Sequence, residues 1–452
     1  MQKLLPQTLI SLAKALPTPL YVVGGSVRDH LANLQKKGVR DLDICAPLAA
    51  QDFASFAKNA GFFVQSVYKN TGTVKLRDNT GADYEYSAFR SDKYIRGVHT
   101  PVEIFFTDDI NLDCRRRDFT CNAVYYDIQA NAYVDPLDGI TAIKEKRLTT
   151  VAPADKVFGE DGLRLMRLAR QAAQLGFTPD NDCLCGAQKN AALIRDITPQ
   201  RIYAELTQIL HADEKYGVKN GQYHGIKLLE ETGVLTHILP ELTLGKGIAQ
   251  RADFHKYDIL EHSLRTLLYA QSEVRLAALL HDVGKPFCTL RDGNVHAHPD
   301  EGERIAGEIL TRLGAPKKTV SQVKTLVKWH MYDFNCQTGE NKLRRFFVEN
   351  YSILDALMLV KQADFSACTD DTSTAPTLIK WQALLAKMRA EGVAFTLKEL
   401  AVNGTELLSA GLAPQTLSQT LHALLLHVAV NPKDNEKARL IKLAKSFRPC
   451  EP

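Results

Sequence analysis

The spacing of apolar residues changes once along this chain, from the period of strands to the period of helices. In the first third, short apolar runs bounded by turn residues are typical of strands, and they cover residues 20–23, 42–46, 62–67, 73–76, 84–88 and 123–127. From Lys156 onward, apolar residues follow helical spacing, as Leu163, Met166 and Ala169 do. The pattern predicts an α/β or α+β domain followed by all-α regions.

The length of the chain predicts several domains. Its 452 residues are about three times the roughly 150 residues of a common domain, so we expect two to four. Turn-rich or proline-bearing segments near residues 135–139, Pro199, 244–247 and 372–376 are candidate joints. Apolar residues make up 45% and charged residues 24%, which is typical of globular proteins and excludes collagen-like and disordered chains. The net charge of +4 permits a nucleic-acid partner without arguing for one.

Membrane and secretory signals are lacking in this sequence. No stretch of about 18 uncharged apolar residues occurs, and Lys3, Pro6 and Lys14 interrupt the apolar N-terminal segment. We therefore expect a cytoplasmic protein with no membrane partner. The cysteines number nine, and the nearest pair, Cys183 and Cys185, has no second pair at zinc-site spacing, so we interpret them as reduced thiols.

Two glycines follow the first strand-like run. Val22 and Val23 lead into Gly24 and Gly25, and a helix-like stretch follows. Residues without a Cβ let backbone N–H groups approach a phosphate at a helix N-terminus. Taken alone, a Gly-Gly pair is more often an ordinary turn.

Two aspartates lie a short distance further on. In Asp41-Leu42-Asp43-Ile44, carboxylates alternate with apolar residues, so a strand would place Asp41 and Asp43 on one face. Such a pair suits Mg²⁺ and phosphoryl transfer, although an isolated pair is more often a solvated strand face.

The motifs of the first third together resemble a known family. Gly24 to Asp29 followed by Asp41 and Asp43, then Glu85 to Arg90, then Arg116 to Ala123, resemble in order the head signature of class II tRNA nucleotidyltransferases and bacterial poly(A) polymerases. The resemblance implies that Asp41 and Asp43 are catalytic and hold Mg²⁺. It implies nucleotide contacts for Gly24, Gly25, Arg28, Arg117, Asp118 and Asn122. The family also has a mobile loop after the acidic strand, which predicts a loop at residues 91–99.

A second motif opens the helical part. Asp161 and Arg164 are three residues apart, and Arg167 and Arg170 continue the spacing. Spacing alone favours a helix start with a basic stripe. In the class II enzymes, however, a Glu-Asp-x-x-Arg motif selects the incoming base, which implies this role for Asp161 and Arg164, with Arg167 and Arg170 beside them as nucleotide or RNA contacts.

Hydrogen-bond chemistry explains how such a pair could choose C and A. Cytosine and adenine both offer an amino donor to Asp161 and a ring acceptor to Arg164. Uracil and guanine present the reversed polarity, so each mispairing leaves buried polar groups unsatisfied, at a cost of about 1–3 kcal/mol.

The back half resembles the HD phosphohydrolase superfamily. His281-Asp282 ends an apolar helix before Gly284-Lys285-Pro286. The resemblance implies a metal site made by His262, His281, Asp282 and Asp364, with His298 and His330 as further ligands or substrate contacts. Imidazole and carboxylate ligands suit Mg²⁺, Mn²⁺, Ni²⁺ or Co²⁺.

These observations predict an α/β nucleotidyltransferase head with a mixed β-sheet, followed by all-α neck, body, HD domain and tail. The expected limits are 1–145 for the head, 146–250 for neck and body, 251–375 for the HD domain and 376–452 for the tail. The expected activity is addition of C, C and A to tRNA from CTP and ATP, with phosphatase or 2′,3′-cyclic phosphodiesterase activity in the HD domain.

Three alternatives stay open. The enzyme could add only A, only CC, or a poly(A) tail, since those enzymes share the motifs. It could be an HD phosphohydrolase with a silent RNA-binding head. A purely structural RNA-binding protein would give no reason for two acids on one strand face. The oligomeric state is not readable from the sequence.

Overall fold

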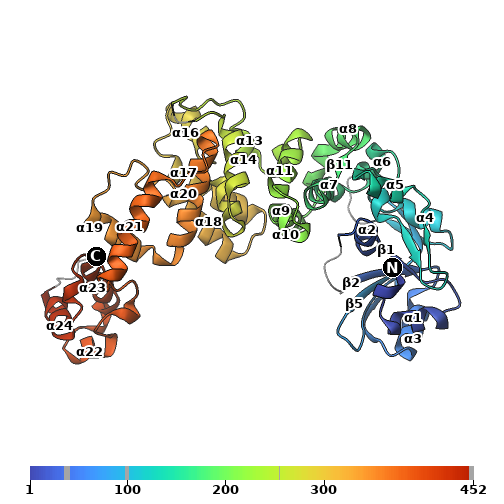
Figure 1. Ribbon diagram of the computed structural model, residues 1–452, viewed down its shortest axis with the longest axis horizontal. Coiled ribbons are helices and arrows are strands. Elements are labelled where there is room, and N and C mark those ends of the chain that lie inside the picture. The colour runs from blue at the N-terminus through green and yellow to red at the C-terminus, as the bar shows by residue number, and fades with distance from the viewer. Residues whose placement is uncertain (35–40, 97–100, 254, 447–452) are drawn as a thin grey trace. The chain divides into compact units, whose positions relative to one another are not determined.

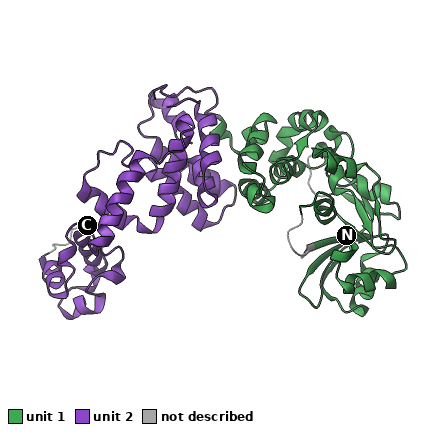
Figure 2. Ribbon diagram, in the orientation of Figure 1, with its two compact units in different colours: residues 1–243 green, residues 244–452 purple. Residues whose placement is uncertain are grey.

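The computed structural model describes residues 1–34, 41–96, 101–253 and 255–446. The chain forms two compact units, residues 1–243 and 244–452 (Figure 2). The described strands lie in the first unit, and the described part of the second unit is built of helices (Figure 1). None of the helices in the described ranges is long and apolar enough to cross a membrane.

A mixed sheet of seven strands forms the front of unit 1. Its strands are β1 (Tyr21–Val23), β2 (Asp41–Ala46), β3 (Phe63–Tyr68), β4 (Thr73–Arg77), β5 (Asp83–Ala88), β8 (Tyr125–Asp127) and β9 (Ala132–Val134). They lie in the order β3-β4-β5-β2-β1-β8-β9. Strands β2 and β5 are parallel, and the other neighbours are antiparallel. The prediction of a mixed sheet is confirmed, and each of the six strand-like runs overlaps one of these strands.

The loop predicted at residues 91–99 is partly wrong. Strand β6 (Arg90–Lys93) pairs antiparallel with β7 (Glu103–Phe106), while residues 97–100 lie outside the described part of the chain. The sequence of β6 is polar throughout, so it lacks the alternation of apolar and polar residues that indicates a strand. The strand forms because its backbone pairs with that of β7.

Eight further helices and a short strand pair follow the sheet's own helices in unit 1. The helices of the sheet region are α1 (Gln7–Ala15), α2 (Gly25–Leu31), α3 (Ala50–Asn59), α4 (Ile110–Arg115) and α5 (Gly139–Lys144). Those that follow are α6 (Ala154–Glu160), α7 (Leu163–Leu175), α8 (Asn181–Asn190), α9 (Pro199–Leu210), α10 (Ala212–Tyr216), α11 (Gly221–Glu231), α12 (Val234–Ile238) and α13 (Pro240–Thr243). Strands β10 (Arg147–Leu148) and β11 (Thr178–Pro179) pair in parallel around α6 and α7.

Helix α7 illustrates why these helices form. It consists mostly of Leu, Arg, Ala, Gln and Met, which are strong helix formers. It ends at Gly176, whose φ of +66° is the left-handed conformation that closes many helices.

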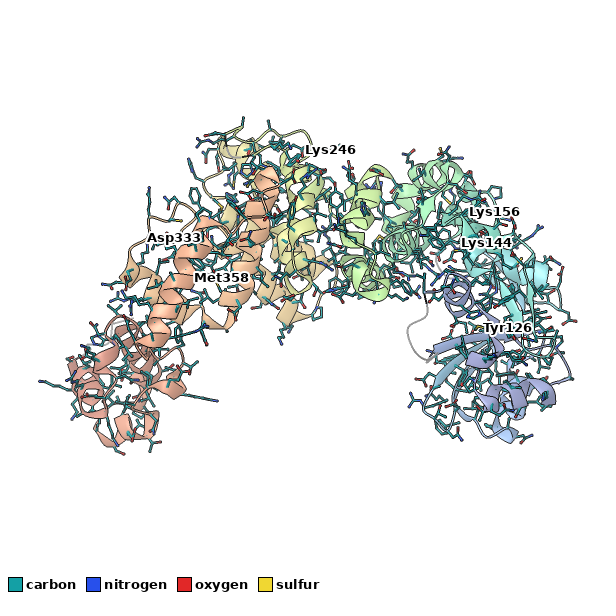
Figure 3. All side chains as sticks on the ribbon, viewed as in Figure 1. Tyr126, Lys144, Lys156, Lys246, Asp333 and Met358 are labelled. Atoms are coloured by element: carbon teal, nitrogen blue, oxygen red, sulfur yellow. The ribbon has the colours of Figure 1, made fainter. Side chains whose placement is uncertain are left out.

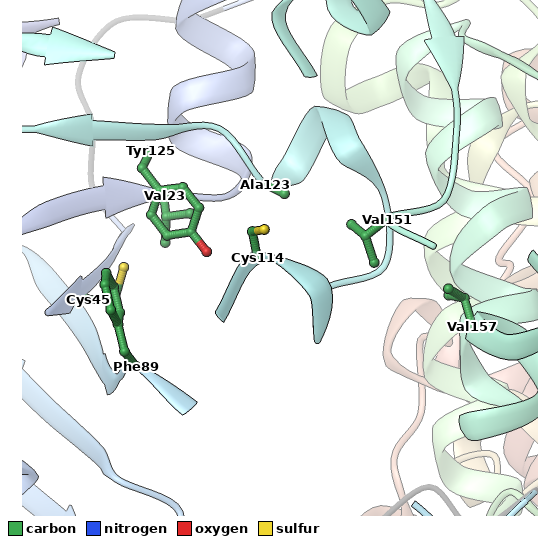
Figure 4. Packing of buried hydrophobic residues seen from close by; sticks show 8 residues of the cluster. All are labelled: Val23, Cys45, Phe89, Cys114, Ala123, Tyr125, Val151 and Val157. Atoms are coloured by element: carbon green, nitrogen blue, oxygen red, sulfur yellow. The ribbon is translucent and has the colours of Figure 1, made fainter. Parts of the chain in front are cut away.

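One hydrophobic cluster joins the sheet to the first of the later helices. Its buried members are Val23, Cys45, Phe89, Cys114, Ala123, Tyr125, Val151 and Val157 (Figure 4). Val157 lies on α6, whereas Val23 and Cys45 lie on the sheet. The sheet and α6 therefore share a core, which fixes the start of α7 relative to the strands.

Unit 2 consists of helices packed in pairs. They are α14 (Ile259–Tyr269), α15 (Arg275–Leu280), α16 (Lys285–Asp292), α17 (His298–Arg312), α18 (Lys317–Trp329), α19 (Glu340–Glu349), α20 (Leu354–Thr369), α21 (Pro376–Ala390), α22 (Gly404–Ser409), α23 (Leu417–Val430) and α24 (Lys437–Ser446). Helix α14 packs on α20, and α17 packs on α18.

A buried carboxylate ties α21 to the loop after α18. Asp333, labelled in Figure 3, is fully buried on its side chain and accepts hydrogen bonds from Trp381 Nε1 at 3.0 Å and Lys380 Nζ at 3.1 Å. Lys361 of α20 donates to the carbonyl of His330 at 2.7 Å and lies over the Trp381 ring. These contacts hold the end of α18 in place against α20.

The close approach of α5 to the segment at 120–124 gives a stability prediction. A Cβ on Gly139 would overlap the carbonyl oxygen of Thr120 and lie 2.6 Å from Val124 Cγ2. We expect Gly139→Ala to lower the free energy of unfolding by about 1–3 kcal/mol, because overpacking forces the backbone apart. Gly339→Ala is the control, since a Cβ there meets no atom within 4 Å. Thermal unfolding followed by circular dichroism measures both, and equal midpoints would contradict the packing argument.

Candidate functional site

The acidic strand and its neighbour carry two exposed carboxylates. Asp43 of β2 is exposed and pairs in parallel register with Glu85 of β5, which is exposed as well. Residues in direct register on adjacent strands point to the same face, so the two carboxylates lie side by side. Asp41 begins β2, but its side chain lies outside the described part. Glu85 was not assigned a role from the sequence, although its place in an acidic strand was a usable signal.

Gly24 keeps the space beside Asp43 open. It follows Val23, the register partner of Asp43 on β1, and its φ of +79° favours glycine. A Cβ at Gly24 would lie only 3.1 Å from Asp43 Oδ2. A carboxylate set with a gap preserved by glycine fits a hard divalent cation, which prefers carboxylate oxygens.

Arg28 connects the helix after the two glycines to the helices behind the sheet. It is 5% exposed, and its Nη1 donates to Asn122 Oδ1 at 2.7 Å and to Gln171 Oε1 at 3.0 Å. Its neighbour Asp29 pairs with it and accepts a hydrogen bond from the hydroxyl of Tyr216 at 2.6 Å. Gln171 and Tyr216 lie on α7 and α10, and no local pattern in the sequence marks them.

Asp118 continues this network. Asn122 Nδ2 donates to Asp118 Oδ1 at 3.0 Å, and Arg167 Nη2 of α7 lies 2.8 Å from Asp118 Oδ2. Burial alone would raise the pKa of Asp118, but the Arg167 charge and the hydrogen bonds from Asn122 and the Phe119 amide lower it to about 2. The stabilisation from this ionised carboxylate is therefore fully present above about pH 4 and is lost as the pH falls through about 2.

We name the set Arg28, Asn122, Asp118, Arg167 and Gln171 the polar bridge. It brings together four residues that were predicted to bind nucleotide and adds Gln171 of α7. Arg167 remains 39% exposed on its side chain, and the nearby Asp118, Glu205, Asp161 and Asp43 charges raise its pKa. The Arg167 guanidinium is thus influenced both by Asp43 of the acidic strand and by Asp161.

Arg117 is held by a carboxylate that the sequence analysis missed. Asp113 is fully buried and lies 2.8 Å from Arg116 Nε and 3.1 Å from Arg117 Nη2. Burial would raise the pKa of Asp113, but the two arginines and the Tyr125 hydroxyl lower it to about 2. The spacings of three and four residues on α4 and just after it were a signal that could have found this contact.

The Asp161 and Arg164 pair lies where α6 meets α7. Asp161 is extended, with φ −147°, between the two helices, and α7 begins two residues later at Leu163, close to the helix start that the spacing favours. Its Oδ1 accepts from the Leu163 amide at 2.9 Å, so it caps α7. Burial raises the pKa of Asp161, while the Leu163 amide and the Arg164 charge oppose the shift.

The side chain of Arg164 is buried, since the residue is 3% exposed, and hydrogen bonds to other protein groups hold it in place. It donates to the carbonyls of Val157 and Arg116, each at 2.9 Å, and to Glu160 Oε2 at 3.0 Å. These contacts engage three of its five N–H groups, and the Tyr94 ring lies 5.5 Å from the guanidinium carbon. The fork is thus rigidly oriented, as recognition of one edge of a base requires.

Arg170 lies further along α7 and serves to join helices. Its Nε donates to Glu205 Oε2 of α9 at 2.6 Å. This contact gives Arg170 a structural role in joining α7 to α9.

Unit 2 contains a cluster of four histidines and two aspartates, of which five side chains are buried and one is partly exposed to solvent. They are His262, His281, Asp282, His298 and His330, each at most 5% exposed on the side chain, together with Asp364 at 20%. The four residues that the sequence predicted as metal ligands therefore lie together, and His298 and His330 join them.

Asp282 is the centre of this cluster. Its Oδ2 lies 3.4 Å from His262 Nε2 and 3.2 Å from His281 Nε2, and its Oδ1 lies 3.4 Å from His298 Nε2 and 3.5 Å from His330 Nε2. Asp364 Oδ1 completes the first set, 3.0 Å from His262 Nε2. The two carboxylate oxygens of Asp282 thus face two separate pairs of histidine nitrogens.

Backbone carbonyls fix which nitrogen of three imidazoles points inward. Nδ1 of His281, His298 and His330 lies 2.8, 2.6 and 2.6 Å from a carbonyl oxygen three residues earlier in the chain. A neutral imidazole that donates Nδ1–H presents the Nε2 lone pair on its other side. The Nε2 atoms of His298 and His330 are 3.2 Å apart, and two facing lone pairs need a proton or a cation between them.

The cluster fits divalent cations. Both carboxylate oxygens of Asp282 are buried without a hydrogen bond of normal geometry, although Lys285 Nζ lies 2.5 Å from Oδ2. The adjacent His281 and Lys285 charges hold the pKa of Asp282 well below its ordinary value despite burial. Buried orphan oxygens facing imidazole nitrogens are the donor set of a metal site. The ammonium of Lys285, which also donates to Gln250, was missed by the sequence analysis.

Three regions of the chain match known families. Residues 20–149 match the poly A polymerase head domain, residues 176–244 match the probable RNA and SrmB-binding site of polymerase A, and residues 259–364 match the HD domain. HD and nucleotidyltransferase domains generally use divalent metals.

Whole-chain comparisons agree with these matches. The chain is 31% identical over 268 residues to the CCA-adding enzyme of Lactococcus lactis subsp. lactis (strain IL1403), a match that covers 58% of this chain and 63% of that enzyme, less than two thirds of its length. It is 32% identical over 378 residues to the A-adding tRNA nucleotidyltransferase of Deinococcus radiodurans, covering 79% of each. The fold is similar to that of the Bacillus stearothermophilus CCA-adding enzyme in complex with CTP, with a TM-score of 0.66 over 97% of this chain and 96% of that one, at 24% identity. The chain therefore belongs to the family of class II tRNA nucleotidyltransferases, the CCA-adding and A-adding enzymes, and carries an HD domain behind its polymerase-type head.

Proposed function

We propose that this protein adds C, C and A in turn to the 3′ end of tRNA, using CTP and ATP and releasing pyrophosphate. The observation that carries the proposal is the exposed pair of carboxylates, Asp43 and Glu85, beside the gap kept by Gly24. The neighbouring polar bridge and the rigid Asp161 and Arg164 pair supply the means to hold and choose a nucleotide.

The reaction joins the 3′-oxygen of the RNA to the α-phosphorus of the nucleotide. The bond from the α-phosphorus to the bridging oxygen breaks, pyrophosphate leaves with that electron pair, and the 3′-hydroxyl loses its proton. A divalent cation such as Mg²⁺, held by Asp41 and Asp43, would neutralise phosphate charge and favour ionisation of the hydroxyl. Arg117 and the exposed side of Arg167 would pair with the triphosphate, because a guanidinium fork matches phosphate oxygens.

The base is chosen by polarity. Asp161 accepts the amino group that cytosine and adenine share, and Arg164 donates to their ring acceptor. The three chain contacts that fix Arg164 resist rearrangement toward uracil or guanine. RNA would be held through its backbone phosphates and the shape of its acceptor arm.

An enzyme that adds only A is the second candidate, and the name of the Deinococcus relative favours it. Transcripts that end before CCA, after C and after CC separate the possibilities. Extension of all three with CTP and ATP supports full CCA addition, whereas extension of the last alone identifies an A-adding enzyme. No incorporation on any acceptor would favour an HD phosphohydrolase with a silent head.

Asp43→Asn tests the head site. Removing one carboxylate charge from the proposed cation site forfeits about 3 kcal/mol or more of transition-state stabilisation, so we expect incorporation to fall at least about a hundredfold. Single-turnover extension with CTP measures the loss. Asp52→Asn on the exposed side of α3 is the matched control and should keep the original rate. Near-normal incorporation by the Asp43 variant would remove the basis of the proposed site.

Asp161→Ala tests base choice. Without the carboxylate, uracil and guanine no longer face a buried acceptor of the wrong polarity. We expect the ratio of CTP to UTP incorporation to fall about tenfold or more. Asp155 lies on α6, as Glu160 does, and its exposed carboxylate pairs with Lys189 of α8. Asp155→Ala is the control and should leave the ratio unchanged. An unaltered ratio in the Asp161 variant would mean that another group reads the base.

For unit 2 we propose hydrolysis of phosphate monoesters or 2′,3′-cyclic phosphates. His262, His281, Asp282 and Asp364 would hold one divalent cation, and Asp282 with His298 and His330 would hold a second, with Mg²⁺, Mn²⁺, Ni²⁺ and Co²⁺ as candidates. Bound cations supply a water of lowered pKa as the nucleophile. Once Asp282 is shared with a cation, the Lys285 ammonium beside it is placed to pair with the substrate phosphate.

The double variant His281→Ala, Asp282→Asn tests this second activity. It should abolish hydrolysis of 2′,3′-cyclic AMP while nucleotide addition proceeds at the wild-type rate, because the two sites lie in different units. His296→Ala, an exposed histidine in the loop before α17, should retain both activities. Loss of both activities together in the double variant, with the fold intact, would refute separate sites.

A further inference from the structure

A second donor cluster lies beside the buried site of unit 2. His255, His262 and Cys368 each offer a ligand atom, and these atoms lie within 4.8 Å of one another. His262 belongs to the buried cluster, whereas His255 and Cys368 are half-buried and lie outside it. Cys368 is one turn after Asp364 on α20, and its Sγ lies 3.4 Å from the carbonyl oxygen of Asp364.

His262 differs from the other three imidazoles of the buried cluster. Their Nδ1 atoms contact backbone carbonyls, but Nδ1 of His262 is buried without a hydrogen-bond partner among the described residues. The side chain of His262 is fully buried. Nδ1 of His255 is likewise buried and unsatisfied, and the two rings lie edge to face with centroids 4.8 Å apart. Unpaired buried nitrogens are costly and call for a ligand.

The proton of His262 has an evident place on its other nitrogen. Nε2 lies 3.0 Å from Asp364 Oδ1 and 3.2 Å from His281 Nε2, so an Nε2–H group can donate there. In that tautomer Nδ1 carries the lone pair, and it is the atom of His262 that can serve an ion next to His255 and Cys368.

We propose that His255, His262 Nδ1 and Cys368 form a separate, thiophilic metal site, the outer site, that controls the proposed hydrolase of unit 2, whose buried cluster is the inner site. Two imidazoles and a thiolate suit Zn²⁺ or Co²⁺ and disfavour Mg²⁺. Ligands around a tetrahedral ion at about 2.0–2.3 Å stand roughly 3.4–3.8 Å apart, so the three side chains need to close by only about 1 Å. A water would complete the site.

Occupation of this outer site withdraws His262 from the inner one. With Nδ1 bound to an ion, the remaining proton stays on Nε2, where it faces Asp364, and Nε2 has no lone pair for an inner cation. Zn²⁺ in the outer site therefore inhibits hydrolysis by removing one inner ligand. This regulatory part rests on the hydrolase proposed above, while the outer site itself does not.

Cobalt provides a readout that is independent of activity. Added to the full metal-free chain, Co²⁺ should give the near-ultraviolet thiolate-to-metal charge-transfer band. We expect Cys368→Ser to lose the band and His255→Gln to weaken its binding. Cys336→Ser is the matched control, since Cys336 is another half-buried free thiol of the same unit, and it should keep the band.

Two further variants separate the outer site from the inner one. In His281→Ala, Asp282→Asn the band should persist, because neither residue belongs to the outer site. Zinc should inhibit hydrolysis by the wild type and lose that effect in Cys368→Ser. A band that survives Cys368→Ser, or its absence from the wild type, would overturn the outer site. A normal band without zinc inhibition of an active hydrolase would overturn its regulatory role, and a normal band with no hydrolysis at all would overturn the hydrolase proposal instead.

Discussion

The polar bridge is the contact on which the architecture of the head site depends. The proposed function needs a fixed separation between the carboxylates of the sheet and the Asp161 and Arg164 pair at the start of α7. Arg28 and Asn122 on the sheet side meet Gln171 and, through Asp118, Arg167 on α7. Buried charged groups are strongly destabilising when one partner is lost, so the bridge tolerates only one arrangement of α7 against the sheet.

Unit 2 uses a different device for the same purpose. Three of its imidazoles are oriented by carbonyls near the ends of their own helices, which leaves Nε2 directed at Asp282. Lys361 lies over the Trp381 ring and donates a hydrogen bond to the carbonyl of His330. The position of His330, a proposed metal ligand, therefore depends on the packing of α20 and α21. Such outer contacts set the tautomer as well as the position of a metal-binding histidine.

The sequence predicted what depends on local pattern and missed what depends on partners distant in the chain. The strands around Asp43 and the helix that ends before His281 follow from periodicity and turn residues. Strand β6 does not, because all of its residues are polar and its partner β7 lies further along the chain. The spacing of Asp161 and the arginines after it favoured a helix start, and the side chain of Asp161 accepts a hydrogen bond from the amide of Leu163, the first residue of α7. Gln171 and Tyr216 contribute to the site from far along the chain, and no spacing rule could have named them.

The two candidate sites differ in how exposed their side chains are to solvent, and the difference matches the size of the substrate proposed for each. The carboxylates of Asp43 and Glu85 are exposed, so the end of a long RNA can approach them. In unit 2 the imidazoles and Asp282 are buried, and Asp364, at 20% exposure, is the member of the cluster that solvent reaches. Any small phosphate would therefore enter past Asp364, one helical turn from Cys368 and near His255. An ion in the proposed outer site would affect the ligands behind it, because His262 has two nitrogens and a single proton to share between the inner and outer sites.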